Sequence, residues 1–193
     1  MADIKPPFTA ESARQKVKAA QSLWNTQSVL HLLEMKHDSL HLLSRNMTVF
    51  ICYPEMKQLL TFRDPAKIYP AYTPDTIWRN RDQFLKGTDE VQQFLTKKWQ
   101  KEKSYRLRKE LFAFTDNRIA VQFWYEYQDA HDEMKWKRCY GLEDWTFDYE
   151  SGKMRKRQMS GNDVLLGPNG NGEGRWFVEG TDVEDAIITE AHW

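Results

Sequence analysis

The stretch that decides the fold is YRLRKELFAFTDNRIAVQFWYEYQ, residues 105–128. Apolar and polar side chains alternate through residues 105–114 and again through residues 118–128, and a period of two indicates β-strands. Thr115-Asp116-Asn117, between them, has the composition of a hairpin turn. The stretch therefore predicts two antiparallel strands. One face of the second strand carries Ile119, Val121, Phe123, Tyr125 and Tyr127.

Two further strands are predicted after this hairpin, at residues 134–148 and 153–164, with Gly141 as the expected place for a bend. Short turns at residues 130–133 and 151–152 connect them. Four consecutive strands with short turns form an antiparallel meander. We expect residues 166–193 to be a loop followed by an acidic, weakly patterned C-terminal tail.

Helices are predicted upstream of the meander. Thr9 is a plausible N-cap for a helix that ends near Asn25 and carries apolar residues at steps of three and four. Asp64-Pro65 suits the start of a short helix, and residues 75–81 read as a strand that leaves into a loop. A second long helix starts at Gly87-Thr88. This order predicts an α+β domain with helices packed on one face of a curved sheet.

Composition excludes several classes of protein. The chain has 193 residues, with 28 Lys and Arg against 28 Asp and Glu, and this balance argues against broad binding to nucleic acid. The N-terminal residues MADIKPPF hold no apolar signal core, and no stretch approaches the ~20 apolar residues of a membrane helix. Two cysteines do not make a disulfide scaffold. We therefore expect a cytoplasmic protein that does not bind membranes.

Six segments together resemble the SnoaL-like proteins of the nuclear transport factor 2-like superfamily, and most closely an uncharacterised bacterial and fungal subfamily. They are residues 6–27, 63–84, 94–99, 108–127 (RKELFAFTDNRIAVQFWYEY), 138–148 (RCYGLEDWTFD) and 155–164 (RKRQMSGNDV). The resemblance implies a cone-shaped, cystatin-like fold in which a curved antiparallel sheet wraps around helices and leaves a pocket. It also implies a homodimer through the outer face of the sheet, which we expect at the strand of residues 118–128.

Residues 28–62 have no counterpart in this resemblance and differ in composition, being rich in leucine and histidine and free of tryptophan. They are either a genuine insertion or a translated intron. The chain is thus interpreted as one SnoaL-like domain, residues 6–165, interrupted by 28–62 and followed by the tail. His37, His41 and Glu34 in the insertion have helical spacing, but no further ligands stand at motif spacing, so no metal site is predicted.

The candidate site residues are polar or large side chains within strands or at strand ends, where every second residue of a curved sheet points inward. Glu110, Glu143 and Asp163 are the candidate catalytic carboxylates. The candidate ligand-binding residues are Trp78, Arg79, Arg81, Arg138, Tyr140, Trp145 and Asn162. Arg138 and Tyr140 share one face of their strand, and Glu143 and Trp145 share the other. We expect Arg138 to pair with Glu110 or Glu143 beside one cavity.

Three interpretations of these residues stay open: a structural ion-pair network, a pocket for a small organic ligand, and acid–base catalysis. The resemblance implies, for an enzyme, cofactor-free chemistry of the isomerase, cyclase or hydrolase type, with a pocket carboxylate as the base. The alternative is a non-catalytic protein-interaction or adaptor module of the same fold. Close titratable groups beside an open cavity favour the enzyme, and a filled cone favours the adaptor.

Overall fold

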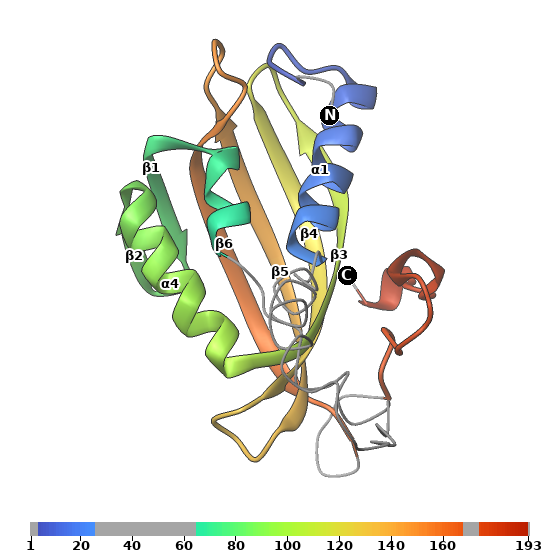
Figure 1. Ribbon diagram of the computed structural model, residues 1–193. Coiled ribbons are helices and arrows are strands. Elements are labelled where there is room, and N and C mark those ends of the chain that lie inside the picture. The colour runs from blue at the N-terminus through green and yellow to red at the C-terminus, as the bar shows by residue number, and fades with distance from the viewer. Residues whose placement is uncertain (1–3, 26–64, 168–173, 193) are drawn as a thin grey trace, which may run out of the picture. The chain divides into compact units, whose positions relative to one another are not determined.

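A curved sheet of six strands, in the order β2-β1-β6-β5-β4-β3, is the centre of the structure (Figure 1). The computed structural model describes residues 4–25, 65–167 and 174–192. Its strands are β1 (Tyr72–Asn80), β2 (Gln83–Lys86), β3 (Glu102–Phe114), β4 (Arg118–Asp129), β5 (Lys135–Phe147) and β6 (Met154–Leu165). Its helices are α1 (Ala10–Asn25), α4 (Gly87–Lys101) and four short 3₁₀ turns, η1 (Pro65–Lys67), η2 (Tyr69–Ala71), η3 (Val183–Asp185) and η4 (Glu190–His192).

The predicted α+β class and the antiparallel meander are confirmed, since β3, β4, β5 and β6 pair in sequence order. One pairing differs from the expectation of an all-antiparallel sheet, because β1 runs parallel to β6. The predicted loop after residue 81 is in fact a hairpin to β2, in which Asn80 pairs with Gln83. Arg81 takes the left-handed conformation in this tight turn, with a φ of 58°.

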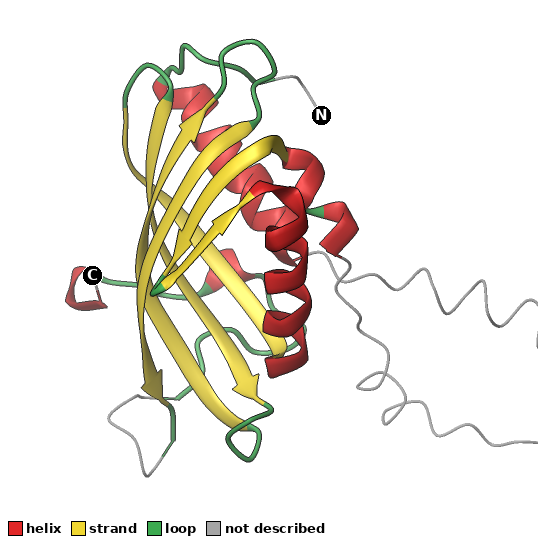
Figure 2. Ribbon diagram, turned by 90° about the vertical axis from the view of Figure 1, so that its left-hand side faces the viewer, coloured by secondary structure: helices red, strands yellow, loops and turns green. Residues whose placement is uncertain are grey.

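Both long helices cover the same face of the sheet, which we call the inner face (Figure 2). The side chains of α1 that are buried recur at steps of three and four and include Val17 and Trp24. Those of α4 follow the same rule. α4 leads directly from β2 to β3, so it connects the two edges of a sheet that does not close. The aromatic face predicted for β4 lies against these helices in the main core.

The start of α1 is fixed as predicted by Thr9. Its Oγ1 accepts a hydrogen bond from the backbone N–H of Ser12 at 3.2 Å, and the Ser12 Oγ accepts one from the N–H of Thr9 at 2.9 Å. This reciprocal pair satisfies two backbone donors that have no partner inside the helix. The cap therefore sets where α1 begins.

The free edge of β3 is covered by polar side chains from α1. The Asn25 amide donates to the Leu107 carbonyl at 2.7 Å and accepts from the Leu107 N–H at 2.9 Å. Gln21 Oε1 accepts from the Lys109 N–H at 2.7 Å, and Lys18 Nζ donates to the Lys109 carbonyl at 2.9 Å. These side chains replace the backbone partners that a further strand would supply.

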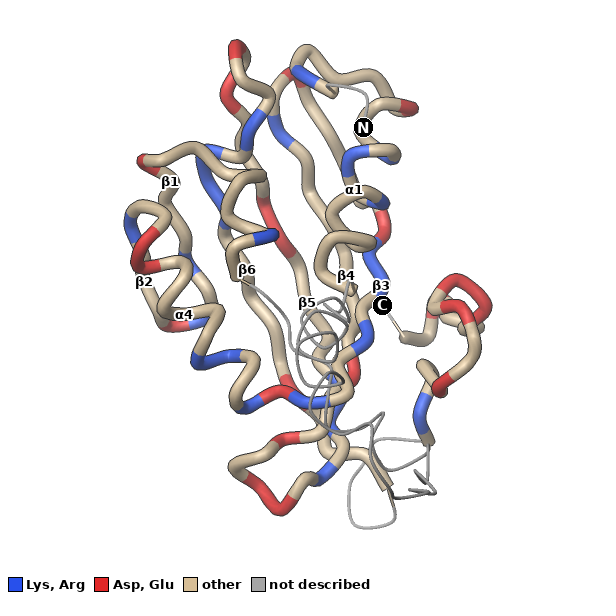
Figure 3. Tube along the Cα trace, viewed as in Figure 1, with Lys and Arg blue, Asp and Glu red and all other residues tan. Residues whose placement is uncertain are grey.

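Residues 174–192 pack on the opposite, outer face of the sheet, where they form a second small core. Trp124, Phe177 and Val183 are its buried members, and Tyr140, Trp176, Ala186 and Ile188 pack around them. The Trp124 Nε1 donates to the His192 carbonyl at 3.1 Å. The tail predicted to be acidic, which carries several red stretches of Asp and Glu in Figure 3, therefore packs against the sheet. We call residues 174–192 the outer strap.

The proposed insertion, residues 28–62, lies outside the described residues, as do His37, His41 and Glu34. Among the described residues, no group of three or more His, Cys, Asp or Glu side chains is placed to hold a metal ion. Within the same ranges, no helix has both the length and the apolar character needed to cross a membrane.

We predict that deletion of residues 28–62 leaves the sheet and its helices folded. The reason is that the described residues belong to one compact unit that residues 28–62 are not part of, and a long loop adds little to the cost of closing the chain. Circular dichroism and a cooperative urea transition of the deletion variant check this. An insoluble variant, or one without a cooperative transition, contradicts it.

Candidate functional site

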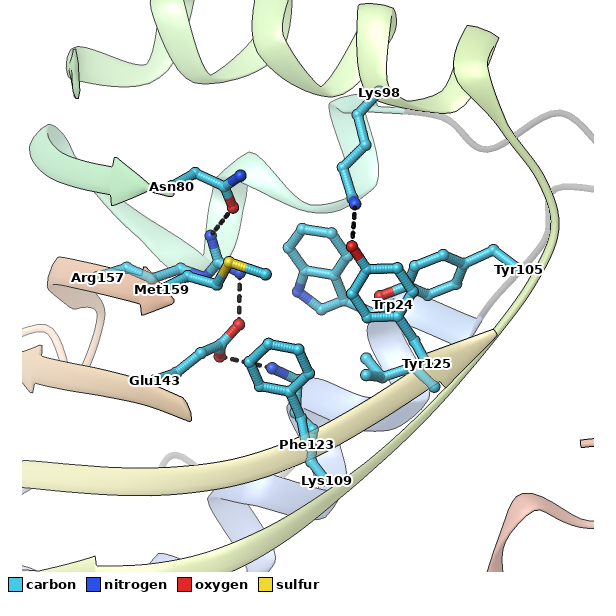
Figure 4. Close-up of a pocket in the computed structure, with 11 residues that line it drawn as sticks. Trp24, Asn80, Lys98, Tyr105, Lys109, Phe123, Tyr125, Glu143, Arg157 and Met159 are labelled. Carbon is cyan, nitrogen blue, oxygen red and sulfur yellow. Dashed lines mark hydrogen bonds and ion pairs between the residues drawn. The ribbon is translucent and has the colours of Figure 1, made fainter. Parts of the chain in front are cut away.

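Three charged side chains from three strands meet on the inner face of the sheet; we call Lys109, Glu143 and Arg157 the inner cluster (Figure 4). The Lys109 Nζ on β3 donates to the Glu143 Oε2 at 2.5 Å, and the Arg157 Nη2 on β6 donates to the Glu143 Oε1 at 2.5 Å. Glu143 stands on β5 between these strands, so the register of the meander brings the three together. One carboxylate thus serves two cations.

Glu143 is held as a carboxylate. Its side chain is 2% exposed, and the Trp145 Nε1 also donates to Oε2, at 2.7 Å. Burial works to raise the pKa of Glu143, but the Arg157 and Lys109 cations outweigh it and lower the pKa to about 2. Because the carboxylate is ionised at neutral pH and both of its oxygens accept hydrogen bonds, this side chain is a poor proton acceptor.

Lys109 is the titratable member of the cluster. Its ammonium lies 5.3 Å from the ring centre of Phe123 and 4.9 Å from that of Trp145. Burial and the Arg157 charge lower the pKa of Lys109, and the Glu143 charge raises it. The lowering effects are larger, so the pKa of Lys109 falls to about 8. The amine therefore loses its proton in a range where an exposed lysine keeps it.

We predict that stability rises with pH between about 8 and 10.5 through Lys109. In that window the unfolded chain keeps the lysine proton, at the ordinary pKa of 10.5, while the folded chain has lost it. Folding is favoured by rising pH wherever the unfolded state binds more protons. Urea unfolding near pH 8 and pH 10, compared between the native chain and Lys109→Met, measures the effect; an equal change with pH in both chains contradicts it.

A cavity of about 10 Å³ lies beside the inner cluster. That volume is close to the smallest that holds a water molecule. Its lining consists of four aromatic side chains, five polar or charged side chains and two aliphatic ones: Trp24, Tyr105, Phe123, Tyr125, Asn80, Lys98, Lys109, Glu143, Arg157, Leu107 and Met159. The interior is thus almost filled, and it is polar on one side and aromatic on the other.

Lys98 reaches the same cavity from α4. Its ammonium contacts the Glu102 carboxylate at 2.5 Å and the Tyr125 hydroxyl at 3.4 Å (Figure 4). It also lies 4.6 Å from the Tyr125 ring centre. Burial lowers the pKa of Lys98, against the pull of Glu102. Unlike Lys109 and Arg157, this lysine has a carboxylate that it shares with no residue of the inner cluster.

A second polar group stands next to Tyr125, and we call it the rim group: Arg81, Tyr127, Cys139 and Asp163. The Arg81 Nη2 contacts Asp163 Oδ1 at 2.6 Å and Cys139 Sγ at 3.1 Å, and the Tyr127 hydroxyl lies 3.2 Å from Asp163 Oδ2. Burial raises the pKa of the Cys139 thiol to about 12, so the thiol is not a nucleophile at neutral pH.

Five of the predicted site residues lie on the inner side of the sheet. Glu143 and Trp145 share the inner face of β5, as the alternation predicted, and Trp78 packs 4.6 Å from the Arg157 guanidinium. Arg81 and Asp163 form an ion pair within the rim group. Of these five, only Glu143 lines the cavity itself.

The expected position of Arg138 is wrong, because it lies on the outer face beneath the outer strap. Its Nε and Nη2 donate to the Glu126 Oε1 at 2.9 and 2.7 Å, and its guanidinium lies 3.5 Å from the ring centre of Trp176. Tyr140 is its neighbour there, with the hydroxyl 3.2 Å from Arg138 Nη1. Even-numbered residues of β5 point outward, so neither reaches Glu110, Glu143 or the cavity.

The remaining predicted residues are also away from the cavity. Glu110 is half exposed and pairs with Lys18 at 3.1 Å and Arg108 at 2.8 Å. Arg79 donates to the Ser160 Oγ at 3.0 Å. Asn162 stands opposite the outward-facing Tyr140 in the β5–β6 register and is exposed. The candidate site residues therefore do not surround one cavity, and Glu143 is the one among them that lines it.

Sequence reasoning missed Lys109, Arg157, Lys98 and Asn80, which line the cavity. A signal existed for Lys109, because it keeps the inward parity of Tyr105 and Leu107 on β3. Arg157 has the same parity as Met159 on β6. Each stands in a lysine- and arginine-rich run whose composition is typical of a solvent-facing segment, so only the parity of the strand distinguishes the inward cation.

Comparison with known proteins identifies the family of the chain and several solved structures that it resembles. No curated protein matches the chain. A solved NTF2-like protein of unknown function from Burkholderia pseudomallei K96243 is 19% identical, with a TM-score of 0.46, over 52% of this chain and 79% of that one. A putative SnoaL-like polyketide cyclase from Shewanella denitrificans OS-217 is 13% identical, with a TM-score of 0.46, over 51% and 79%.

A third solved structure, an NTF2-like protein of unknown function from an Exiguobacterium species, is 10% identical, with a TM-score of 0.45, over 50% of this chain and 81% of that one. The profile of one protein family matches residues 6–61 and 54–177. The chain therefore belongs to the family described as "Protein of unknown function (DUF1348)".

Proposed function

We propose that the protein is a cytoplasmic, SnoaL-like small-molecule pocket protein that binds a small organic anion on the inner face of its sheet. The observation that carries this proposal is the inner cluster, in which Lys109 and Arg157 share the single carboxylate of Glu143. A buried charge without a partner is costly. The carboxylate of a ligand supplies the second negative charge.

The surroundings of the inner cluster support an anionic ligand with a flat, apolar part. Among the cavity-lining residues, Lys98, Lys109 and Arg157 carry positive charge and Glu143 carries negative charge. Trp24, Tyr105, Phe123 and Tyr125 provide aromatic surface. Ligand sites of this mainly apolar kind, with a few converging polar groups, are common in proteins. The cavity is small, so binding requires a flexible side chain such as Met159 to move.

A cofactor-free isomerase, cyclase or hydrolase activity is the catalytic form of this proposal. Glu143 is a poor base there because two cations hold it ionised. Glu110 and Asp163 stand outside the cavity lining. Lys109 is the group that transfers a proton in this proposal, since its pKa of about 8 lies near neutral pH. Arg157 holds the carboxylate or a developing oxyanion.

Thermal-shift measurement of the full-length chain with small organic acids, each beside its neutral amide, tests the proposal. We expect the acids to raise the melting temperature and the amides to leave it unchanged. Arg157→Lys keeps the positive charge but loses the bidentate donor geometry of the guanidinium. It is therefore expected to reduce the rise in melting temperature. Arg155→Gln is the matched control, because Arg155 is on the same strand and its side chain is 45% exposed. Equal shifts with acids and amides contradict the proposal.

The nearly filled interior favours a second candidate, a non-catalytic interaction or adaptor module of the same fold. A cavity of about 10 Å³ is too small to hold an organic molecule unless the side chains around it move. This candidate predicts that no small acid binds and that the outer or rim surfaces hold a protein partner. The thermal-shift panel therefore separates the two.

We also propose that the protein is a homodimer through the outer face of the sheet. The strand of residues 118–128, where we expected the contact, buries its outward Trp124 beneath the outer strap. Phe112 on β3 and Leu142 on β5, 64% and 52% exposed, offer apolar contact area in its place. Light scattering at micromolar concentration is expected to give twice the chain mass. A strict monomer under those conditions contradicts the proposal.

A further inference from the structure

We infer that the inner cluster is a covalent carbonyl site, in which the Lys109 amine forms an imine with a small 2-oxo acid while Arg157 holds the acid's carboxylate. This inference rests on the proposed anion site and names its ligand class. The juxtaposition that carries it is the pair of head groups, one amine and one guanidinium, that contact the two oxygens of the same carboxylate.

The spacing of the two head groups selects the ligand. Because Glu143 bridges Lys109 and Arg157 through its two oxygens, the two nitrogen atoms are separated by one carboxylate group and a hydrogen bond on each side of it. A ligand that reaches both must carry its anionic group and its reactive carbon close together. In a 2-oxo acid the keto carbon is bonded directly to the carboxylate carbon, so this compound class meets the requirement.

The surroundings of Lys109 favour a neutral, nucleophilic amine. The charged groups that face it are Glu143 from β5, Arg157 from β6 and Lys98 from α4. Two of the three are cations, which disfavour a further positive charge, and the ammonium is 2% exposed. Lysines placed in apolar surroundings beside other cations are the ones that act as Schiff-base nucleophiles. The aromatic rings of Phe123 and Trp145 complete such surroundings here.

The step balances without a cofactor. The neutral amine adds to the keto carbon, the carbon–oxygen π pair moves to oxygen, and proton transfer gives a carbinolamine. The hydroxyl then leaves as water while the nitrogen lone pair forms the carbon–nitrogen double bond. Overall, one lysine ammonium and one ketone give one protonated imine and one water molecule, with no change of oxidation state.

Reductive trapping tests the inference on the full-length chain. The protein is incubated with pyruvate and sodium cyanoborohydride, and the product is analysed by intact mass and peptide mapping. We expect one reduced adduct per chain, on Lys109. The yield of this adduct should fall as the pH is lowered, because the lysine amine must lose its proton before it reacts. Lys109→Arg keeps a cation beside Glu143 and abolishes the adduct. Lys97→Arg, an exposed lysine of α4, retains it.

A second variant keeps the test decisive if the native cavity is too closed to admit pyruvate. Met159→Ala removes a flexible side chain from the cavity lining and is expected to increase the yield at Lys109. Labelling of exposed lysines without any adduct on Lys109, in both the native chain and Met159→Ala, overturns the inference.

Lactate separates this failure from failure of the proposed function, because it has the carboxylate but no keto group. A thermal shift with lactate, together with absence of the pyruvate adduct, refutes the imine and retains the anion site. Absence of both refutes both.

Discussion

Glu143→Gln is expected to lower the free energy of unfolding by about 3–5 kcal/mol at neutral pH, the loss typical when one partner of a buried ion pair is removed. The substitution preserves the shape of the side chain but leaves Lys109 and Arg157, 2% and 5% exposed, without a counter-charge. It also weakens the hydrogen bond from the Trp145 indole. Urea unfolding followed by tryptophan fluorescence measures the change.

Asp144→Asn is the matched control, one residue along the same strand. Asp144 pairs with Arg118 on the surface, where the two side chains are 37% and 57% exposed. Removing this ion pair is therefore expected to lower the free energy of unfolding by only about 0–1 kcal/mol. Loss of the Glu143 charge lowers the pKa of Lys109 further in the variant, so the difference in unfolding free energy from the native chain narrows as the pH rises toward the native pKa of about 8. A Glu143→Gln chain as stable as Asp144→Asn shows that the inner cluster is not a buried charge group.

Arg138→Met is expected to cost about 3 kcal/mol and to loosen the outer strap. Glu126 is fully buried, and its carboxylate accepts the N–H groups of Trp176 at 2.8 Å and Phe177 at 3.1 Å in addition to the arginine. Arg175, 3.7 Å away, remains as a weaker partner, which places the loss at the lower end for a buried pair. Limited proteolysis should cut the strap of the variant first, and urea unfolding gives the free energy.

Arg155→Met provides the comparison for this substitution, since its ion pair with Asp75 is exposed on both sides. Ligand binding on the inner face should survive Arg138→Met, because the arginine points to the other side of the sheet. Loss of binding with an intact strap contradicts this placement.

The alternation of side chains was enough to predict the faces of the strands. β4 shows this best, because its odd residues from Ile119 to Tyr127 enter the main core while Trp124 enters the small core under the strap. The helix cap at Thr9 was equally readable, since it depends on residues three apart in the chain. Local periodicity and local capping are properties of short segments, and the sequence displays both directly.

The partner of Arg138 was predictable in principle but was assigned wrongly. The β4–β5 hairpin pairs Asp129 with Lys135, and counting back along both strands sets Glu126 opposite Arg138. Glu143, one of the two predicted partners, has the opposite parity on the same strand, so it faces the other side. Counting register from the turn identifies a cross-strand pair that residue type alone does not.

Other features depend on contacts between distant segments. The strap is acidic and weakly patterned, and it docks because Arg106, Arg108 and Arg138 from two strands reach its backbone carbonyls and Glu126 receives its N–H groups. The inner cluster depends on the relative register of β3, β5 and β6. No short pattern encodes such a meeting point, and so the cations that line the cavity were not foreseen.

The amide of Asn25 has a consequence for behaviour in a crowded solution. An uncovered strand edge is a template onto which another chain can add a strand, and such addition leads to fibrils. On β3 that template is occupied, because Asn25 donates to and accepts from Leu107 as an incoming strand would, and Gln21 and Lys18 occupy the groups of Lys109. The other edge, β2, is only four residues long and ends in Lys86. The domain therefore carries built-in protection against edge-to-edge aggregation, supplied by three polar side chains of a helix that also forms part of its core.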